Sequence, residues 1–291
     1  MSADKKGAWV GAKFNRKEDH RLTTGKGRYL ADLSMPGMLH LTFVRSERAH
    51  ATINSIDTSE AMALPGVVAI VTGEDIKEKI LPMPQPVVQP GLPAKFPKHW
   101  PLAVGKVKFH GEPIAAVVTR DKYVGADAAE LIVVDYTDLP YVGDPESALE
   151  SDSPIVHEGW DDNLIFEMGF TGGDTEESQA QNAAEVEEIM QTADIVVKKR
   201  FRVQRCGVTP METRGVLASW DESDGLIAHI TTQRPHIDRL ALSDILEIPS
   251  EKMRVVAPRD QGGGFGVKAP FYREPILVCY LAKALGRPIK W

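Results

Sequence analysis

The sequence predicts an α+β fold that consists of two α/β units. Its 291 residues are enough for two packed domains. In the first half, short apolar runs with strand propensity alternate with helical stretches and turn residues. In the second half, a strand, a helix, another strand, a glycine-rich loop and a further helix follow one another. This order is typical of units in which helices cover a sheet.

The first unit is expected at residues 21–145, behind a polar leader at residues 1–20. A short helix is predicted from Ser59 up to the Pro65–Gly66 turn, and a second helix at 121–130. Apolar and β-branched runs between turn signals predict strands at 37–46, 67–71, 113–119 and 131–140. The stretch 81–97 is too rich in proline for regular structure.

A connector with an acidic helix is expected at residues 146–192. Between Asp174 and Gln191 there are six acidic residues and no lysine or arginine. A weak apolar stripe at helical spacing consists of Ala183, Val186, Ile189 and Met190. We interpret this stretch as a helix whose acidic face is solvated.

The second unit is expected at residues 193–291. Strands are predicted at 193–203, 225–233 and 253–258, with the start of a further strand at Ile289. Pro235 opens a helix. Another helix at 272–286 ends at Gly286, with Pro288 just beyond it. The glycine loop at 261–268 joins the third of these strands to the second helix.

The composition excludes several classes of protein. The net charge of −7 argues against a nucleic-acid groove, which needs a basic face. No apolar run approaches the roughly 20 residues that span a bilayer. The first twenty residues have no apolar core of a secretory signal, so a cytoplasmic location is expected. Cys206 and Cys279 form neither a metal-binding spacing nor a disulfide framework, and both are expected in or near the core.

The loop at 261–268 has four glycines in five positions, 262–264 and 266. Glycine allows positive φ angles and close approach of the backbone. A loop of this kind between a strand and a helix can offer several N–H groups to an anion. Two interpretations stay open from the loop alone: a site for a phosphate- or pyrophosphate-bearing ligand, or a tight turn needed for packing.

Two familiar phosphate loops fit this stretch poorly. A Walker A loop requires Ser or Thr after its lysine, whereas Ala269 follows Lys268. Residues 264–269 satisfy the pattern G-x-G-x-x-A of dinucleotide-binding proteins. That pattern also requires an acidic residue about 20 positions later, and none lies between Cys279 and Trp291. An NAD-binding dehydrogenase is therefore the weakest of the hypotheses.

Several separated motifs resemble one known family. They are GKGRYLADLSMPGMLHLTFVRSERAHATI (25–53), PMETRGVLASWD (210–221), TTQRPHIDRLALSDILEIP (231–249) and GGGFGVK (262–268). Together they resemble the N-terminal portion of the large, molybdopterin-binding subunit of the xanthine dehydrogenase, aldehyde oxidase and aerobic carbon monoxide dehydrogenase family. GGGFGVKAPFYREP (262–275) is most similar to the carbon monoxide dehydrogenase-like branch. The resemblance implies a hammerhead-like α/β domain followed by the first part of a molybdopterin-binding domain.

The resemblance also implies a molybdenum–molybdopterin cofactor, in its cytosine dinucleotide form, with no protein side chain bound directly to the metal. Gln233 would donate a hydrogen bond to an oxo ligand of molybdenum, a role that suits a neutral amide. Phe265 would form a wall of the pocket. The cofactor-binding residues would be Gln233, Gly263, Gly264, Phe265 and Gly266. The alternative for Gln233 is a cap on the following helix. Glu212 and Arg214 are candidates for an ion pair that either shapes the pocket or is purely structural.

Three departures from the family pattern limit what the resemblance implies. Ala269 stands where the purine-oxidising members have an acidic residue, which argues against a purine substrate. Glu47 stands where many relatives have proline. The family's catalytic glutamate lies further downstream than Trp291, so no residue of this sequence is assigned that role.

The function implied is that of a molybdenum-dependent hydroxylase or dehydrogenase, which oxidises a small organic substrate or CO with water as the oxygen source. Electrons would pass to 2Fe–2S and FAD groups on partner subunits. Activity would require a chain that supplies the second half of the molybdopterin-binding region. The alternative function is a non-catalytic subunit that holds the cofactor or assists assembly.

Overall fold

The structure is a computed structural model that describes residues 11–83, 94–167, 172–173, 175–204 and 206–291. The chain forms two compact units, each of which contains separated segments of the sequence. Unit 1 consists of residues 1–39, 209–243 and 248–291, and unit 2 of residues 40–208 and 244–247. Both contain strands and helices, so the predicted α+β class is confirmed.

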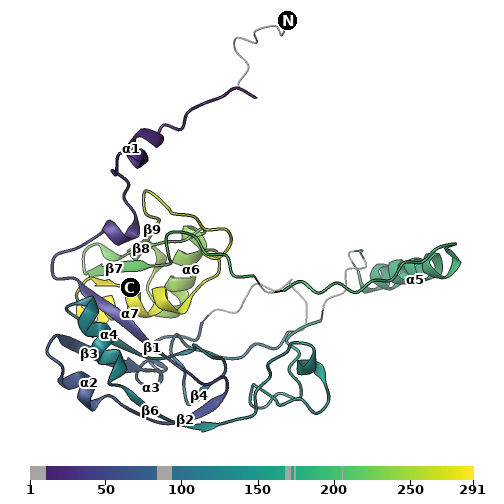
Figure 1. Ribbon diagram of the computed structural model, residues 1–291, viewed down its shortest axis with the longest axis horizontal. Coiled ribbons are helices and arrows are strands. Elements are labelled where there is room, and N and C mark those ends of the chain that lie inside the picture. The colour runs from purple at the N-terminus through teal and green to yellow at the C-terminus, as the bar shows by residue number, and fades with distance from the viewer. Residues whose placement is uncertain (1–10, 84–93, 168–171, 174, 205) are drawn as a thin grey trace, which may run out of the picture. The chain divides into compact units, whose positions relative to one another are not determined.

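The sheet of unit 1 has strands β7 (Val216–Asp221), β8 (Gly225–Ile230), β9 (Met253–Val256) and β10 (Ile289–Lys290) in the order β10-β7-β8-β9. β7 pairs antiparallel with both β8 and β10, and β8 pairs parallel with β9. A parallel pair requires a crossover connection. Helix α6 (Pro235–Leu246) provides it, followed by a short 3-10 helix, η3 (Ser250–Lys252). Figure 1 shows β7, β8 and β9 side by side.

Helix α7 (Arg273–Leu285) packs against β7, β8 and β10 and contributes much of the core of unit 1. Its fully buried residues include Ile276, Leu277 and Val278. The helix ends at Gly286, which has a φ of +59°, as the sequence predicts. The N-terminal part of unit 1 contains only two short elements, α1 (Asp19–Thr23) and the 3-10 helix η1 (Leu30–Asp32).

Unit 2 contains two groups of strands. The first has the order β3-β5-β1, and its members are β1 (Leu39–Arg45), β3 (Val67–Thr72) and β5 (Pro113–Thr119). The second has the order β4-β2-β6, and its members are β2 (Ala51–Asp57), β4 (Lys106–Val107) and β6 (Val133–Asp138). All of the strand pairs within these groups are antiparallel. Every residue of β5 is buried, because its side chains pack into apolar clusters, Ala115 and Val117 in one and Ile114 in another.

Short helices accompany these strands: α2 (Ser59–Ala63), α3 (Gly73–Ile76), α4 (Lys122–Glu130) and the 3-10 helix η2 (Ser147–Leu149). Ala61 of α2 and Ala128 of α4 share a buried cluster with Ala115 and Val117 of β5. The strands predicted near 37–46, 67–71, 113–119 and 131–140 are confirmed, as are both helices of this region. Most of the proline-rich stretch 81–97 lies outside the described residues, at 84–93.

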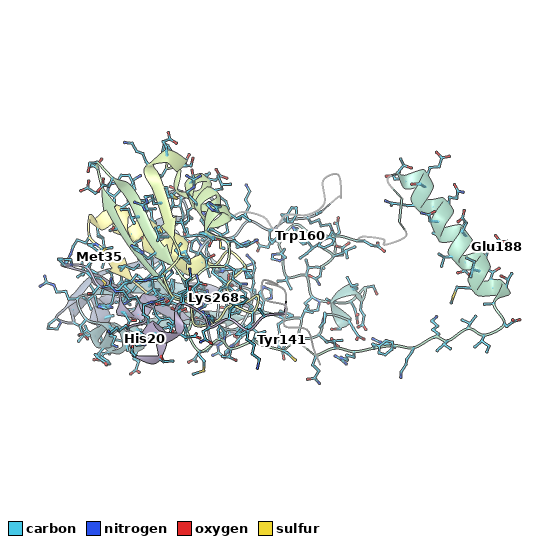
Figure 2. The ribbon with its side chains drawn as sticks, turned by 90° about the horizontal axis from the view of Figure 1, so that it is seen from above. His20, Met35, Tyr141, Trp160, Glu188 and Lys268 are labelled. Carbon is cyan, nitrogen blue, oxygen red and sulfur yellow. The ribbon has the colours of Figure 1, made fainter. Side chains whose placement is uncertain are left out.

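The acidic stretch forms the helix α5 (Glu176–Thr192), none of whose residues is buried. Figure 2 shows its side chains, with Glu188 labelled, on all sides of the helix. The strand predicted at 193–203 is wrong: residues 195–204 have no regular structure. Their apolar side chains are exposed, Val197 by 82% and Val203 by 90%. A strand requires a neighbour for its backbone hydrogen bonds, and this segment has none in the part of the chain that the structure describes.

The two cysteines differ from one another. Cys279 is buried in α7, and burial raises the pKa of its thiol. Cys206 is exposed, so the expectation of a position in or near the core was wrong for this residue. No helix within the described residues is long and apolar enough to cross a membrane.

Candidate functional site

The glycine loop lies in unit 1 between β9 and α7, as the sequence predicts. Two turns shape it: Val267 N–H donates to Gly264 O at 3.0 Å, and Ala269 N–H donates to Gly266 O at 3.0 Å. Gly263 and Gly266 have φ angles of +98° and +88°. Phe265 also has a positive φ, +48°, which is rare for a bulky residue. The loop therefore requires glycine at two positions and imposes strain at a third.

Gln233 follows β8 and directly contacts this loop. Its backbone N–H donates to Lys268 O at 3.0 Å, and its side-chain Oε1 accepts a hydrogen bond from Gly266 N–H at 3.1 Å. A Cβ added at Gly264 would lie 2.8 Å from Cδ of Gln233, which is too close for a real contact. The structure thus brings Gln233 together with the loop residues that the sequence selects. Its side chain bonds to the loop, and no bond to α6 occurs among the described residues, which argues against the helix-capping alternative.

Several donors at this site have no partner in the described chain. The backbone N–H groups of Gly263, Gly264 and Phe265, three in succession, donate no hydrogen bond to described residues. The Nε2 of Gln233 likewise makes no hydrogen bond there, and this side chain is exposed. The Phe265 ring is 71% exposed. Successive unpaired N–H groups form a concave site for an anion, and an amide beside them adds a neutral donor.

A carboxylate fixes the base of the loop. Glu212 Oε2 accepts from Gly262 N–H at 3.0 Å and from Lys268 Nζ at 2.8 Å. The side chain of Lys268 has no exposed surface, and that of Glu212 is 12% exposed. A Cβ on Gly262 would lie 2.5 Å from the Cβ of Glu212, so the close approach requires glycine. The sequence has no local signal for this role of Lys268, because Glu212 lies 56 residues away.

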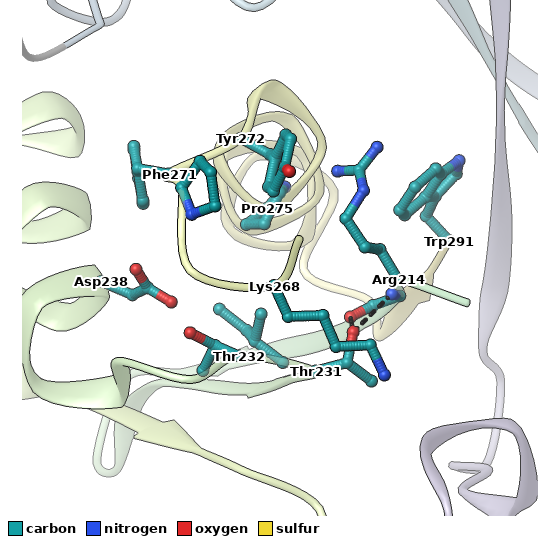
Figure 3. Close-up of a pocket in the computed structure, with 12 residues that line it drawn as sticks. Arg214, Thr231, Thr232, Asp238, Lys268, Phe271, Tyr272, Pro275 and Trp291 are labelled. Carbon is teal, nitrogen blue, oxygen red and sulfur yellow. Dashed lines mark hydrogen bonds between the residues drawn. The ribbon is translucent and has the colours of Figure 1, made fainter. Parts of the chain in front are cut away.

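The pairing expected between Glu212 and Arg214 is wrong. Arg214 instead donates to both carboxylate oxygens of Glu274, at 2.9 and 3.2 Å. Its guanidinium also lies 3.7 Å from the centre of the Tyr272 ring and 5.3 Å from that of Trp291. Figure 3 shows it between the two rings. Glu212 and Glu274 each pair with a cation far away in the sequence, so local spacing could not reveal these ion pairs.

A small cavity lies behind the TTQ segment, with Thr231, Thr232, Asp238 and Lys268 among its lining residues (Figure 3). Its volume is about 20 Å³, which suits about one water molecule. Sites for small organic molecules are far larger, about 300–1,000 Å³. Burial raises the pKa of Asp238, whose Oδ1 has no hydrogen-bond partner among the described residues. The cavity is therefore too small for a cofactor, and the candidate site is the open face with Gln233 and the loop.

Two family models match the chain. The first, described as the a/b hammerhead domain of aldehyde oxidase and xanthine dehydrogenase, matches residues 24–140. The second, described as a molybdopterin cofactor-binding domain, matches residues 169–291 and therefore includes Gln233 and the glycine loop.

Known proteins agree with these matches. The large chain of carbon monoxide dehydrogenase from Afipia carboxidovorans is 39% identical over 97% of this chain and 34% of its own length. The large subunit of nicotine 6-hydroxylase from Paenarthrobacter nicotinovorans is 34% identical over 97% of this chain and 33% of its own length. The crystal structure of quinoline 2-oxidoreductase from Pseudomonas putida 86 superposes with a TM-score of 0.85 and 36% identity, over 97% of this chain and 34% of that one.

A hammerhead domain followed by a molybdopterin cofactor-binding domain defines the class of protein to which the chain belongs. It belongs to the family of large subunits that includes xanthine dehydrogenase, aldehyde oxidase and carbon monoxide dehydrogenase, as the sequence motifs predict. The chain spans about a third of the length of the curated relatives that it matches.

Proposed function

We propose that this chain contributes the glycine loop and Gln233 to the cofactor site of a molybdenum hydroxylase. The assembled enzyme oxidises a small organic substrate or CO with water as the oxygen source. It passes electrons to 2Fe–2S and FAD groups on partner subunits, and a further chain supplies the second half of the molybdopterin-binding region. We also propose that the first domain spans residues 21–145 and the second residues 193–291.

One observation carries this proposal. The N–H groups of Gly263, Gly264 and Phe265 donate to no described residue, and the side chain of Gln233 contacts the same loop at Gly264 and, through Oε1, at Gly266. These donors fit a pyrophosphate-bearing pterin dinucleotide, because each can donate to an anionic or oxo acceptor. The exposed ring of Phe265 provides an apolar wall next to them. The cytosine dinucleotide form of the cofactor is part of the proposal.

The residues have separate tasks. When bound, the molybdenum–molybdopterin group supplies two-electron redox chemistry. The loop N–H groups bind it, and Phe265 excludes water from one side. Gln233 donates from Nε2 toward the molybdenum centre without adding charge to it. Its Oε1 accepts a hydrogen bond from Gly266 N–H, and its NH₂ group is the donor that faces away from that bond.

The test uses the complete enzyme, assembled with its companion subunits. Metal analysis and the fluorescence of released pterin measure how much cofactor each variant holds. We expect Gln233→Glu to keep the loop anchor and most of the cofactor but to lose turnover. Gln204→Glu, at another exposed glutamine, is the matched control and should behave as the wild type. A complete enzyme without molybdenum or pterin would overturn the proposal, and cofactor without turnover would favour the non-catalytic alternative.

A further inference from the structure

Residues 19–32 of unit 1, termed here the N-terminal strap, bond to Asp260, which precedes the glycine loop, and to Glu212, which holds both ends of the loop. At the first end, Asp260 directly precedes the loop. Its carboxylate accepts two hydrogen bonds from the guanidinium of Arg21, one of them at 2.6 Å, and a third from Arg28 N–H at 2.7 Å. Asp260 N–H in turn donates to Arg28 O at 3.2 Å. The Asp260 side chain is only 7% exposed, so the strap covers it.

At the second contact, the strap bonds to the carboxylate that fixes the base of the loop. Leu30 N–H donates to Glu212 Oε1 at 3.3 Å, while Oε2 of the same residue holds Gly262 N–H and Lys268 Nζ. Leu30 is buried, and its side chain lies so close to Gly215 that an added Cβ there would be 2.5 Å from it. One carboxylate therefore bonds the strap, the start of the loop and its end.

This arrangement matters because the two internal turns restrict the loop only from Gly264 onward. Glycine loses more conformational freedom on ordering than any other residue, and four of the five residues at 262–266 are glycine. The contacts that restrict the loop come from Gln233, from Glu212 and, through Asp260, from residues more than two hundred positions away in the sequence. Bidentate Arg–carboxylate pairs have a narrow geometry and so transmit position well.

We propose that the N-terminal strap sets the conformation of the glycine loop, with Arg21 and Asp260 as positioning residues. Neither residue touches the cofactor in this role. Only one consequence of this inference rests on the proposed function: a loop without the strap should hold the cofactor poorly.

Amide hydrogen exchange on the full 291-residue chain tests the first part without any cofactor. Four amides in and directly after the loop donate hydrogen bonds and report its order, those of Gly262, Gly266, Val267 and Ala269. We expect Arg21→Met to speed exchange in peptides that cover 260–269 by roughly tenfold, as for a local opening, and to leave α7 unchanged. Arg21→Lys, which keeps the charge but not the paired donors, should give a smaller increase.

Arg16→Met is the matched control, because Arg16 lies just before the strap and is 4.0 Å from Glu18 and Asp19 at the surface. It should leave exchange of the loop unchanged. Unchanged exchange in Arg21→Met would overturn the proposal. So would an equal increase in all peptides, which would indicate a general loss of stability.

Cofactor content in the assembled enzyme separates this inference from the proposed function. If Arg21→Met loosens the loop and lowers the molybdenum and pterin content together, the strap proposal and the proposed function are both supported. If it loosens the loop while occupancy stays at the wild-type level, the strap still positions the loop, but the loop is not what holds the cofactor. If occupancy falls while loop exchange is unchanged, the strap proposal fails and the proposed function survives.

Discussion

The amide of Gln233 and the backbone of Gly266 are joined by a hydrogen bond of 3.1 Å from Gly266 N–H to Oε1. The same side chain occupies the space in which Gly264 would otherwise hold a Cβ. Gln233 thus has two structural tasks in the loop as well as the donor role proposed for its Nε2. Substitutions at this position can separate the tasks.

The first prediction compares Gln233→Glu with Gln233→Ala in the assembled enzyme. Glutamate keeps an oxygen for Gly266 N–H but loses the outward donor, whereas alanine loses both. We expect both variants to slow turnover by roughly 10- to 1000-fold, as for loss of one positioned donor. Only the alanine variant should increase amide exchange at Gly266. Wild-type turnover in Gln233→Glu would contradict the donor role.

The second prediction concerns two glycines that are required for different reasons. Gly264→Ala should displace the Gln233 side chain and lower molybdenum content, and Gly264→Val should do so more severely. At Gly266 an added Cβ meets nothing, but the φ of +88° strains any other residue. Gly266→Ala should therefore cost about 1–2 kcal/mol in the free energy of unfolding. Metal-to-protein ratios and denaturant unfolding measure these two effects.

Phe265→Leu is the control for this pair. It keeps an apolar side chain at the same exposed position, so it should retain the cofactor while it alters turnover. Loss of metal in this variant, together with retention in Gly264→Val, would reverse our assignment of the loop.

The third prediction concerns the pair of Lys268 and Glu212. Lys268→Met leaves a largely buried carboxylate without its cation and should cost about 3–5 kcal/mol in the free energy of unfolding. The double change Lys268→Met with Glu212→Gln should cost less than the sum of the two single changes. Denaturant unfolding of the full chain gives the four values needed. Additive costs would show that the two side chains act independently.

The fourth prediction concerns pH. The guanidinium of Arg21, and then Arg28 N–H, lower the pKa of Asp260 to about 2. Because the folded pKa lies below the unfolded value of about 3.9, the carboxylate stabilises the fold fully above that pH. The contribution is lost as the pH falls toward 2. The advantage of the wild type over Asp260→Asn in free energy of unfolding should therefore be constant above about pH 5 and shrink below it. An advantage that grows on acidification would refute this assignment.

The fifth prediction concerns the exposed apolar side chains of residues 195–203, which include Ile195, Val197 and Phe201. Exposed apolar residues on an extended backbone without a partner strand favour association between chains. We expect the 291-residue chain on its own to be inactive and to self-associate as its concentration rises. Val197→Lys should reduce the association. Sedimentation velocity over a range of concentrations measures it, and a monomer throughout would contradict the expectation.

Periodicity and turn chemistry were sufficient to predict most of the regular structure. The continuous apolar run at 113–119 is β5, and the stop at Gly286 ends α7 as expected. The segment 193–203 shows where this reasoning fails. Strand propensity is local, but a strand exists only where another segment takes its hydrogen bonds, and the sequence does not say whether one does.

The candidate site, like the regular structure, could be predicted only in part. The family resemblance assigned Gln233 and the glycine loop to one cofactor site, but the hydrogen bond between them was not predicted. The partners of Glu212 and Arg214 lie 56 and 60 residues away, and that of Asp260 lies 239 residues away. No pattern within a window of a few residues contains such pairs. The available signals were an acid directly before the glycine loop, Asp260, and a lysine within it, Lys268. Both charged side chains form ion pairs that hold the loop.

The bond between Gln233 and Gly266 also has a consequence for affinity. Long polar side chains usually lose rotamer freedom when they bind a ligand, and this ordering weakens binding. Here the folded chain already orients the amide, since its oxygen accepts a hydrogen bond from Gly266 N–H and its Cδ lies against Gly264. An acceptor that arrives at Nε2 meets a donor with its orientation set. Part of the ordering entropy at this residue is therefore lost when the protein folds, before any ligand arrives.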